Sequence, residues 1–202
     1  IMTEQQADNN SDDLSENIIG ITKYETEAKK KKEFLPWHKP RKQFVRHEQW
    51  VNQIIKMIND VEPENQILKY LGLPGDDLLD LRYFHQQICE PKNLQLKFLG
   101  FNKGAAENSP EKVELNISLD EVTKLKFIDP LSAVLPDDIC RIAEDNSMAW
   151  EVSKKMGPYD VMNIDLCDGF GKHDPDQFQQ THYNTLMKLL TLQARRVNPW
   201  LL

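Results

Sequence analysis

The chain has 202 residues, a formal net charge of −7 and a hydrophobic content of 40%. That length fits one domain with an appendage, the composition excludes collagen-like, mucin-like and wholly disordered chains, and no window approaches the roughly 18 consecutive apolar residues of a membrane helix. Three cysteines far apart in the sequence, with no CxxC or HExxH motif, argue against a disulfide framework and a zinc site, so we expect a reducing, cytoplasmic location.

Charge is strongly segregated near the N-terminus. Residues 1–27 carry seven acidic residues against one lysine, and residues 28–46 carry eight basic residues against one glutamate. Residues 2–16 offer almost nothing apolar to bury, so we expect them to be disordered. The sequence divides into a flexible tail of mixed charge (1–33), a basic-aromatic arm with a helix (34–62) and a folded domain (63–202).

The basic segment interleaves cationic and aromatic side chains, and prolines at positions 36 and 40 predict an extended arm. Such an arm can place cations on phosphates and stack aromatic faces on bases. A docking arm for a protein partner, or a strap folded back on its own acidic domain, explains the same pattern. We expect an intermolecular contact with protein or nucleic acid. The residues that would make it are Trp37, Arg41, Lys42 and Arg46.

The first elements follow from apolar spacing. Residues 43–60 form a predicted helix, because apolar side chains recur at three- and four-residue steps. A short apolar run at 67–71 ends in a turn with two glycines. Residues 78–89 fit a strand or a helix equally well. Residues 94–101 alternate and end in apolar residues, which predicts a strand.

The second half alternates helices and strands. Ser118 is a predicted N-cap for a helix over 119–125, with a glutamate three residues later. Residues 137–156 predict one long helix that ends at Gly-Pro. Residues 159–167 are apolar enough for a central, buried strand. A helix over 177–197 precedes a last apolar run.

Strands that alternate with helices predict an α/β fold with a Rossmann-like parallel sheet and flanking helices. The final apolar run, residues 199–202, resembles the start of a further sheet strand. A sheet of only three or four strands would leave a long exposed edge. We therefore expect the domain to be incomplete at its C-terminus.

Ligands of open α/β sheets bind beyond the carboxyl ends of the strands, near the switch point. Gly72 and Gly75 follow the first apolar run, where glycine lets a backbone approach a ligand closely. Asn102 follows the strand 94–101, where an acid commonly binds a ribose hydroxyl. Asp165 and Asp168 come at the end of the buried strand, where charged side chains seldom lie without a functional role. Ordinary turns and backbone-capping carboxylates are the alternative in each case.

The order of these motifs over about residues 67–202 resembles the class I S-adenosylmethionine-dependent methyltransferases. The resemblance rests on the glycine turn after a first strand, on Gly100-Phe101-Asn102, on Asp129 in the run KFIDPLS, and on Asp165 at the end of a fourth strand. It implies that S-adenosylmethionine is the cofactor and that Asp165 and Asp168 face the methyl acceptor. The cofactor-binding residues that it implies are Gly72, Gly75, Asn102 and Asp129.

Joined to the basic arm, such a domain looks like divergent methyltransferase-like proteins of bacterial defence systems. That likeness implies a subunit of a multi-protein antiviral complex. The glycine turn departs from the family's E/D-x-G-x-G pattern. The alternative function is therefore a catalytically inert Rossmann-like scaffold that binds protein or nucleic acid.

Overall fold

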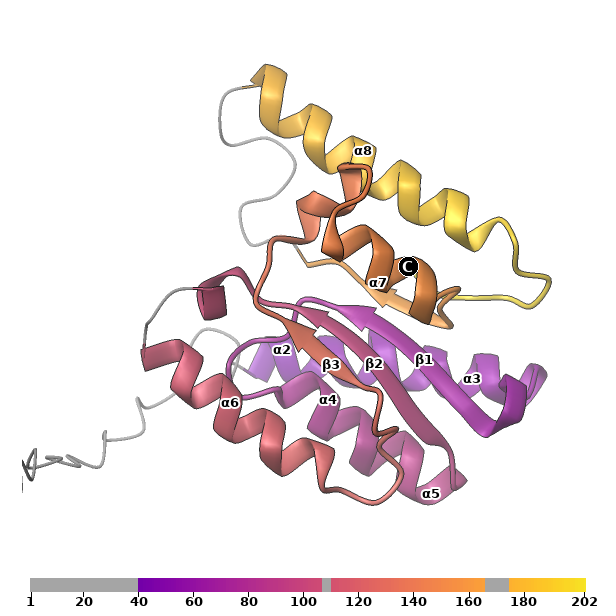
Figure 1. Ribbon diagram of the computed structural model, residues 1–202. Helices are drawn as coiled ribbons and strands as arrows, with labels where there is room; N and C mark the ends of the chain where they lie inside the picture. The colour runs from indigo at the N-terminus through magenta and orange to yellow at the C-terminus, as the bar shows by residue number, and fades with distance from the viewer. Residues whose placement is uncertain (1–39, 107–109, 166–174) are drawn as a thin grey trace, which may run out of the picture. The chain divides into compact units, whose positions relative to one another are not determined.

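A parallel β-sheet lies at the centre of residues 40–202, which form one unit. The computed structural model describes residues 40–106, 110–165 and 175–202 (Figure 1). The strand order is β3-β2-β1-β4, and every pairing is parallel. This confirms the expected α/β fold with a Rossmann-like sheet. The strands are β1 (Ile67–Gly72), β2 (Gln95–Phe101), β3 (Ala133–Leu135) and β4 (Val161–Asn163).

Two long strands form the middle of the sheet, and shorter ones flank them. β1 and β2 pair over six residues, from Ile67 opposite Gln95 onwards. β4 pairs only with the last three residues of β1, so the strand expected over 159–167 is shorter than predicted within the described residues. Leu201 forms an isolated parallel bridge with Val161. The final apolar run thus pairs with the sheet beside β4, as its sequence predicts.

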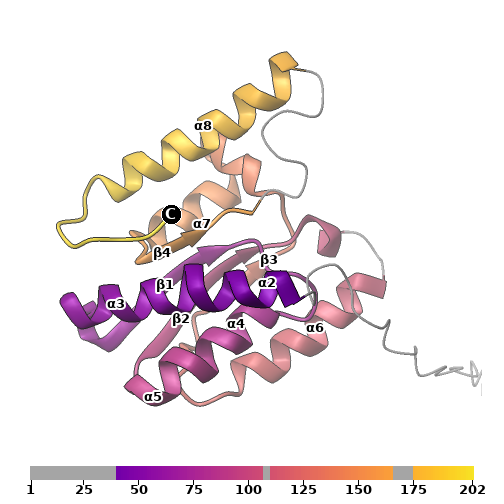
Figure 2. The same ribbon diagram turned by 180° about the vertical axis from the view of Figure 1, so that it is seen from behind.

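One face of the sheet is covered by the helices that precede β3 (Figures 1 and 2). Leu68 and Phe98 from the strands are fully buried there against Ile54 and Leu81 of the covering helices. Each such side chain contributes about 1.5–3 kcal/mol through burial. The helical segments before β3 are α2 (Pro40–Phe44), η2 (Val45–Val51), α3 (Asn52–Asp60), η3 (Glu64–Gln66), α4 (Leu79–Phe84), η4 (His85–Cys89), α5 (Glu90–Lys92), η5 (Lys103–Ala106) and α6 (Pro110–Thr123).

The opposite face is covered by the helices that follow β3 (Figure 1). They are η6 (Ile139–Ala143), α7 (Met148–Met156) and α8 (Pro175–Gln193). Leu71 and Leu99 of the strands are buried there against Ala149 and Leu189. Because both faces are covered, β1 and β2 are apolar on both sides near their carboxyl ends, as parallel strands commonly are. No helix among the described residues has the length and apolar character needed to cross a membrane.

The helix before the sheet begins earlier than predicted. α2, η2 and α3 follow one another without a break in helical backbone, so the helical stretch begins at Pro40. The prediction that the chain around Pro40 is extended and that the helix begins only at residue 43 is wrong. Proline at the first position of a helix loses no hydrogen bond, and its fixed φ suits the helix. The part of the arm before Pro40, including Trp37, lies outside the described residues.

Two further helices differ from their predicted bounds. Residues 78–89, for which strand and helix were both open, are helical from Leu79 onwards, and the helical stretch continues to Lys92. The helix predicted over 119–125 with Ser118 as its N-cap begins at Pro110 instead. Ser118 therefore lies inside α6 and caps nothing.

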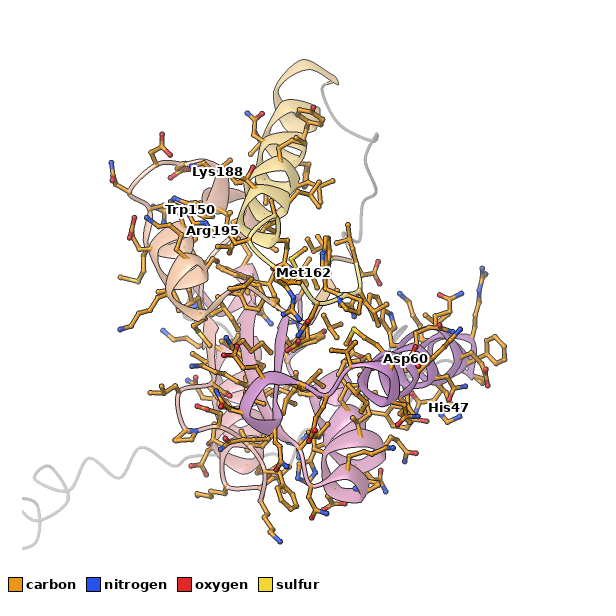
Figure 3. All side chains as sticks on the ribbon, turned by 90° about the vertical axis from the view of Figure 1, so that its right-hand side faces the viewer. His47, Asp60, Trp150, Met162, Lys188 and Arg195 are labelled. Carbon is orange, nitrogen blue, oxygen red and sulfur yellow. The ribbon has the colours of Figure 1, made fainter. Side chains whose placement is uncertain are left out.

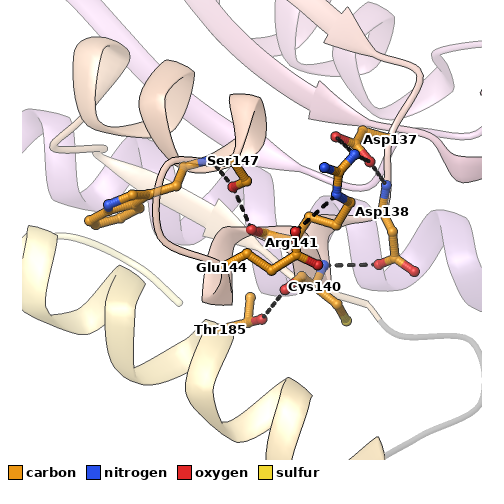
Figure 4. A network of polar contacts seen from close by, with 8 residues as sticks. Asp137, Asp138, Cys140, Arg141, Glu144, Ser147 and Thr185 are labelled. Carbon is orange, nitrogen blue, oxygen red and sulfur yellow. Dashed lines mark hydrogen bonds and ion pairs between the residues drawn. The ribbon is translucent and has the colours of Figure 1, made fainter.

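The single helix predicted over 137–156 is two separate helices, η6 and α7. Ser147 accepts a hydrogen bond from the Trp150 amide (3.1 Å) and so caps α7, while its hydroxyl donates to the Arg141 carbonyl (2.6 Å) (Figure 4). Thr185 of α8 donates to the Cys140 carbonyl (3.1 Å). Asn146, just before the cap, has a φ of 63°, which ends helical propagation. These side-chain hydrogen bonds thus satisfy backbone groups that a continuous helix would have paired with each other.

Candidate functional site

The strand order places a topological switch point between β1 and β4. The chain adds β2 and β3 on one side of β1 and then crosses to add β4 on the other side. Loops leave the carboxyl ends of β1 and β4 in opposite directions at such a point, and ligands of open α/β sheets bind there. The residues that follow these strands therefore define the candidate site.

The loop after β1 is tied to the end of β2 by an amide side chain. Asn102 donates through Nδ2 to the Pro74 carbonyl (3.2 Å) and to Oδ1 of Asp76 (3.0 Å). The structure thus brings Asn102 and the loop that contains Gly75 together at one edge of the sheet. Asp76 was not among the residues singled out from the sequence. Its carboxylate lies beside the carboxyl end of β2, where sequence reasoning found only an amide.

Two glycines at this edge make room for the protein's own side chains. A Cβ on Gly72 would lie 2.6 Å from Cζ of Tyr70, and a Cβ on Gly100 would lie 2.7 Å from Cγ of Pro74. Real Cβ atoms do not approach so closely, so both positions require glycine for packing. Gly75 differs, because it is exposed and its nearest neighbour would be in ordinary contact. Gly75 is the glycine at which a ligand could approach the backbone.

A buried polar cluster lies behind the switch point. Tyr70 is only 2% exposed, and its hydroxyl is hydrogen-bonded to the Asn163 side chain at the end of β4. Burial, followed by the charge of Asp80, raises the pKa of Tyr70 above its ordinary value. The hydrogen bond and the charge of Arg46 offset only part of this rise. Tyr70 is therefore a neutral phenol at neutral pH.

Arg46 completes this cluster rather than facing solvent. Its side chain is 8% exposed and forms an ion pair with Asp80, which is 22% exposed. Nη1 of Arg46 also donates to Oε1 of Gln43 (2.8 Å). The π-helical turn of η2 places Arg46 and Val51, five residues apart, among the buried residues. Arg46 thus anchors the helix to the domain, and the prediction of an intermolecular contact through it does not fit its burial.

Asp165 follows the carboxyl end of β4 and forms an ion pair with Lys42 of α2 (2.6 Å). Both side chains are exposed, at 62% and 48%, so the pair contributes at most about 1 kcal/mol. Arg41, the neighbour of Lys42, is exposed and forms no ion pair with the described residues. Asp168, which the resemblance also places beside the methyl acceptor as a catalytic residue, lies outside the described residues.

Asp129 lies at the other end of the sheet. Its amide donates to the carbonyl of Leu96 (2.8 Å), the second residue of β2, whereas Asn102 follows the last residue of that strand. Its Oδ1 accepts from the Leu131 amide (2.7 Å), so the carboxylate stabilises a local turn. The structure does not bring Asp129 together with Gly72, Gly75 or Asn102.

Acidic side chains also follow β3 at the carboxyl edge. Asp138 accepts a hydrogen bond from the Cys140 amide (2.9 Å) and pairs with Lys103 (3.2 Å). Burial raises the pKa of Asp138, but these contacts outweigh it and leave the pKa below its ordinary value. Burial, and then the charge of Asp138, raises the pKa of the Cys140 thiol to about 12, so this thiol is not a nucleophile at neutral pH. Among the described residues no cluster of histidine, cysteine and acidic side chains could hold a metal ion.

The parallel sheet and its switch point define the class of this protein as a Rossmann-like α/β domain. The chain belongs to the PP_RS20740-like family, whose model matches residues 31–202. Comparison with curated proteins finds no match, and comparison with solved structures finds none.

Proposed function

We propose that this chain binds S-adenosylmethionine at the carboxyl ends of β1 and β2, as a divergent methyltransferase-like domain. The observation that supports the proposal most is the pairing of Asn102 with Asp76 at the switch-point edge. Rossmann-like domains hold a ribose hydroxyl with an acid near the end of the second strand. Asp76 supplies a carboxylate at that place from the neighbouring loop. A carboxylate has about four acceptor sites, so it can accept hydrogen bonds from more than one donor.

The residues around Asp76 fit a nucleoside in other respects. Gly75 is exposed in the same loop, so a ligand can approach its backbone. Asp165, at the end of β4, would orient the methyl acceptor or accept its proton as the acceptor attacks the methyl carbon and the carbon–sulfur bond breaks. Lys42 pairs with Asp165 and would have to release it for that role. Asp129 is not part of this proposal, because it lies at the other end of β2.

Calorimetric titration of the full chain with S-adenosylmethionine and with its demethylated product tests this function. We expect saturable binding of both ligands, and we expect Asp76→Ala to weaken both by about tenfold or more through loss of a charged hydrogen-bond acceptor. Asp120→Ala is the matched control, because Asp120 is an exposed aspartate on α6 that pairs with Lys124 one turn away. Absence of binding, or equal loss in the control, would refute the proposal.

The second candidate function is an inert scaffold that binds a polyanion, such as nucleic acid, through α2. One observation favours it: Arg41 and Lys42 are exposed next to Phe44, which is 63% exposed. Exposed cations beside an aromatic ring suit phosphates and stacked bases. The double variant Arg41→Ala/Lys42→Ala should then weaken binding to single-stranded nucleic acid. It should also reduce the slope of log K against log[salt] by about 1.4. An unchanged slope would exclude α2 as the contact.

A further inference from the structure

A small polar pocket lies at the amino ends of β1 and β4, at the opposite edge from the switch point. Its volume is about 210 Å³. Pockets for drug-sized molecules are commonly larger, about 300–1,000 Å³, so this one suits a small ion or a single functional group. The polar residues that line it are Glu64, Lys69, Asp160, Arg195, Arg196 and Asn198.

One ion pair forms a fixed wall of the pocket. Arg196 donates through Nη2 to Oδ1 of Asp160 (2.8 Å), and these side chains are 12% and 7% exposed. Oδ2 of Asp160 accepts from the backbone amide of Lys69 (2.6 Å). The charge of Asp160 is therefore neutralised within the fold and does not neutralise the other cations of the pocket.

The remaining cations have no carboxylate partner within the described residues. The side chain of Lys69 is half-buried and forms no ion pair there, and the same holds for the exposed side chain of Arg195. Lys97 of β2 lies directly in register with Lys69, and it too forms no ion pair with a described residue. Like charges in register on neighbouring strands repel each other. Glu64 is the one further acid in the lining, so positive charge is in excess.

Arginines at the end of α8 would by themselves complement the carbonyl end of that helix. The pocket differs from an ordinary helix end, because Lys69 belongs to β1 and lines the same pocket as the two arginines. In Figure 3 Arg195 appears with Trp150 and Lys188 on the side of α7 and α8, away from His47 on the helix of the other face. The pocket is thus separate from α2 and from its exposed cations.

We propose that this pocket binds a phosphate-type oxyanion, with Lys69 and Arg195 as its charged ligands and the Asp160–Arg196 pair as a fixed wall. Guanidinium and ammonium groups from two elements would then share one anion, which offsets the repulsion between Lys69 and Lys97. The pocket is too small for a whole nucleotide, so the ligand is free phosphate or the phosphate group of a larger molecule that extends into solvent.

Calorimetric titration of the full chain with inorganic phosphate, at constant ionic strength, tests the site. We expect saturable binding that weakens about tenfold in Arg195→Gln and in Lys69→Gln. Arg195 is exposed at the end of α8, so its variant keeps the test valid even if Lys69→Gln fails to fold. Arg141→Gln is the matched control, because Arg141 is an exposed arginine of η6 that pairs with Asp137 and Glu144 at the other edge of the sheet, and we expect no change in phosphate affinity.

A parallel titration with AMP distinguishes the two sources of the anion. AMP that binds at least as tightly as phosphate, and loses affinity in the same variants, identifies the phosphate group of a larger molecule as the ligand. Phosphate that binds while AMP does not identifies the free anion. The proposal is overturned if phosphate shows no saturation below roughly 10 mM, or if Arg141→Gln weakens its binding as much as Arg195→Gln does.

Discussion

Replacement of Arg46 by alanine should destabilise the domain, although this arginine belongs to a basic segment whose other described cations are exposed. Arg46 is 8% exposed and paired with Asp80, and it also donates to Gln43 one turn earlier in the same helix. Arg46→Ala removes the cation and leaves the Asp80 carboxylate largely buried without it. The cost is therefore that of an uncompensated charge rather than that of a lost surface contact.

The magnitude follows from the exposure of the two partners. Removal of one partner from a fully buried ion pair costs about 3–5 kcal/mol. The Asp80 side chain is 22% exposed, so water can partly solvate its carboxylate after the substitution. We therefore expect the free energy of unfolding to fall by about 2–3 kcal/mol. For a domain of this size that corresponds to a decrease in Tm of about 5–10 °C.

Urea denaturation and thermal melting measure the effect, with Arg41→Ala as the control on the same helix. Arg41 is exposed and forms no ion pair with the described residues, so its loss should change stability by less than about 0.5 kcal/mol. The double variant Arg46→Ala/Asp80→Ala should lose less than the two single variants together, because it removes the unpaired charge. If Arg46→Ala is as harmless as Arg41→Ala, the anchoring role is wrong and Arg46 becomes available to a partner.

Three further predictions concern the packing around the sheet. Gln193→Leu should cost about 2–5 kcal/mol in urea denaturation, because Gln193 pairs with both the amide and the carbonyl of buried Tyr159 (2.7 Å each); a loss below about 1 kcal/mol would contradict this. Gly100→Ala should cost about 1–3 kcal/mol through its clash with Pro74, and unchanged thermal stability would show that the loop moves away freely. Asp138→Ala should cost about 0.5–2 kcal/mol at pH 7 as a lost helix cap. Because the folded pKa of Asp138 lies below its unfolded value of 3.8, this stabilisation is fully present above that value and is lost as pH falls through the folded pKa. The difference between wild type and variant should therefore shrink at acidic pH, and a pH-independent difference would show that the carboxylate charge plays no part.

Local patterns in the sequence were sufficient to predict most of the secondary structure. The helix around α3 and the strand β2 follow from apolar spacing, which a few neighbouring residues carry. The parallel α/β class follows from the alternation of such segments along the chain. The pairing of Leu201 with Val161 follows from the apolar character of the last residues.

Element boundaries depended on side-chain hydrogen bonds between segments. The break between η6 and α7 needs Ser147 to bond back to Arg141 and Thr185 of α8 to bond to Cys140. The residues from 137 to 156 do not carry this information alone, because a serine inside a helical pattern has more than one possible partner. The early start of α2 at Pro40 likewise depends on whether the following residues find a surface to pack on.

The candidate site was the least predictable part, because its geometry depends on contacts between residues far apart in the chain. The register of β2 with the residues around Ile128 places Asp129 at the amino end of the sheet, away from Asn102. The side chain of Asn102 is hydrogen-bonded to Asp76, which is 26 residues away in the sequence. Lys42 is hydrogen-bonded to Asp165, which is 123 residues away. A sequence pattern shows which residues can carry charge or donate hydrogen bonds. Strand order and register decide which of these residues meet, because they set the distances between elements that are far apart in the sequence.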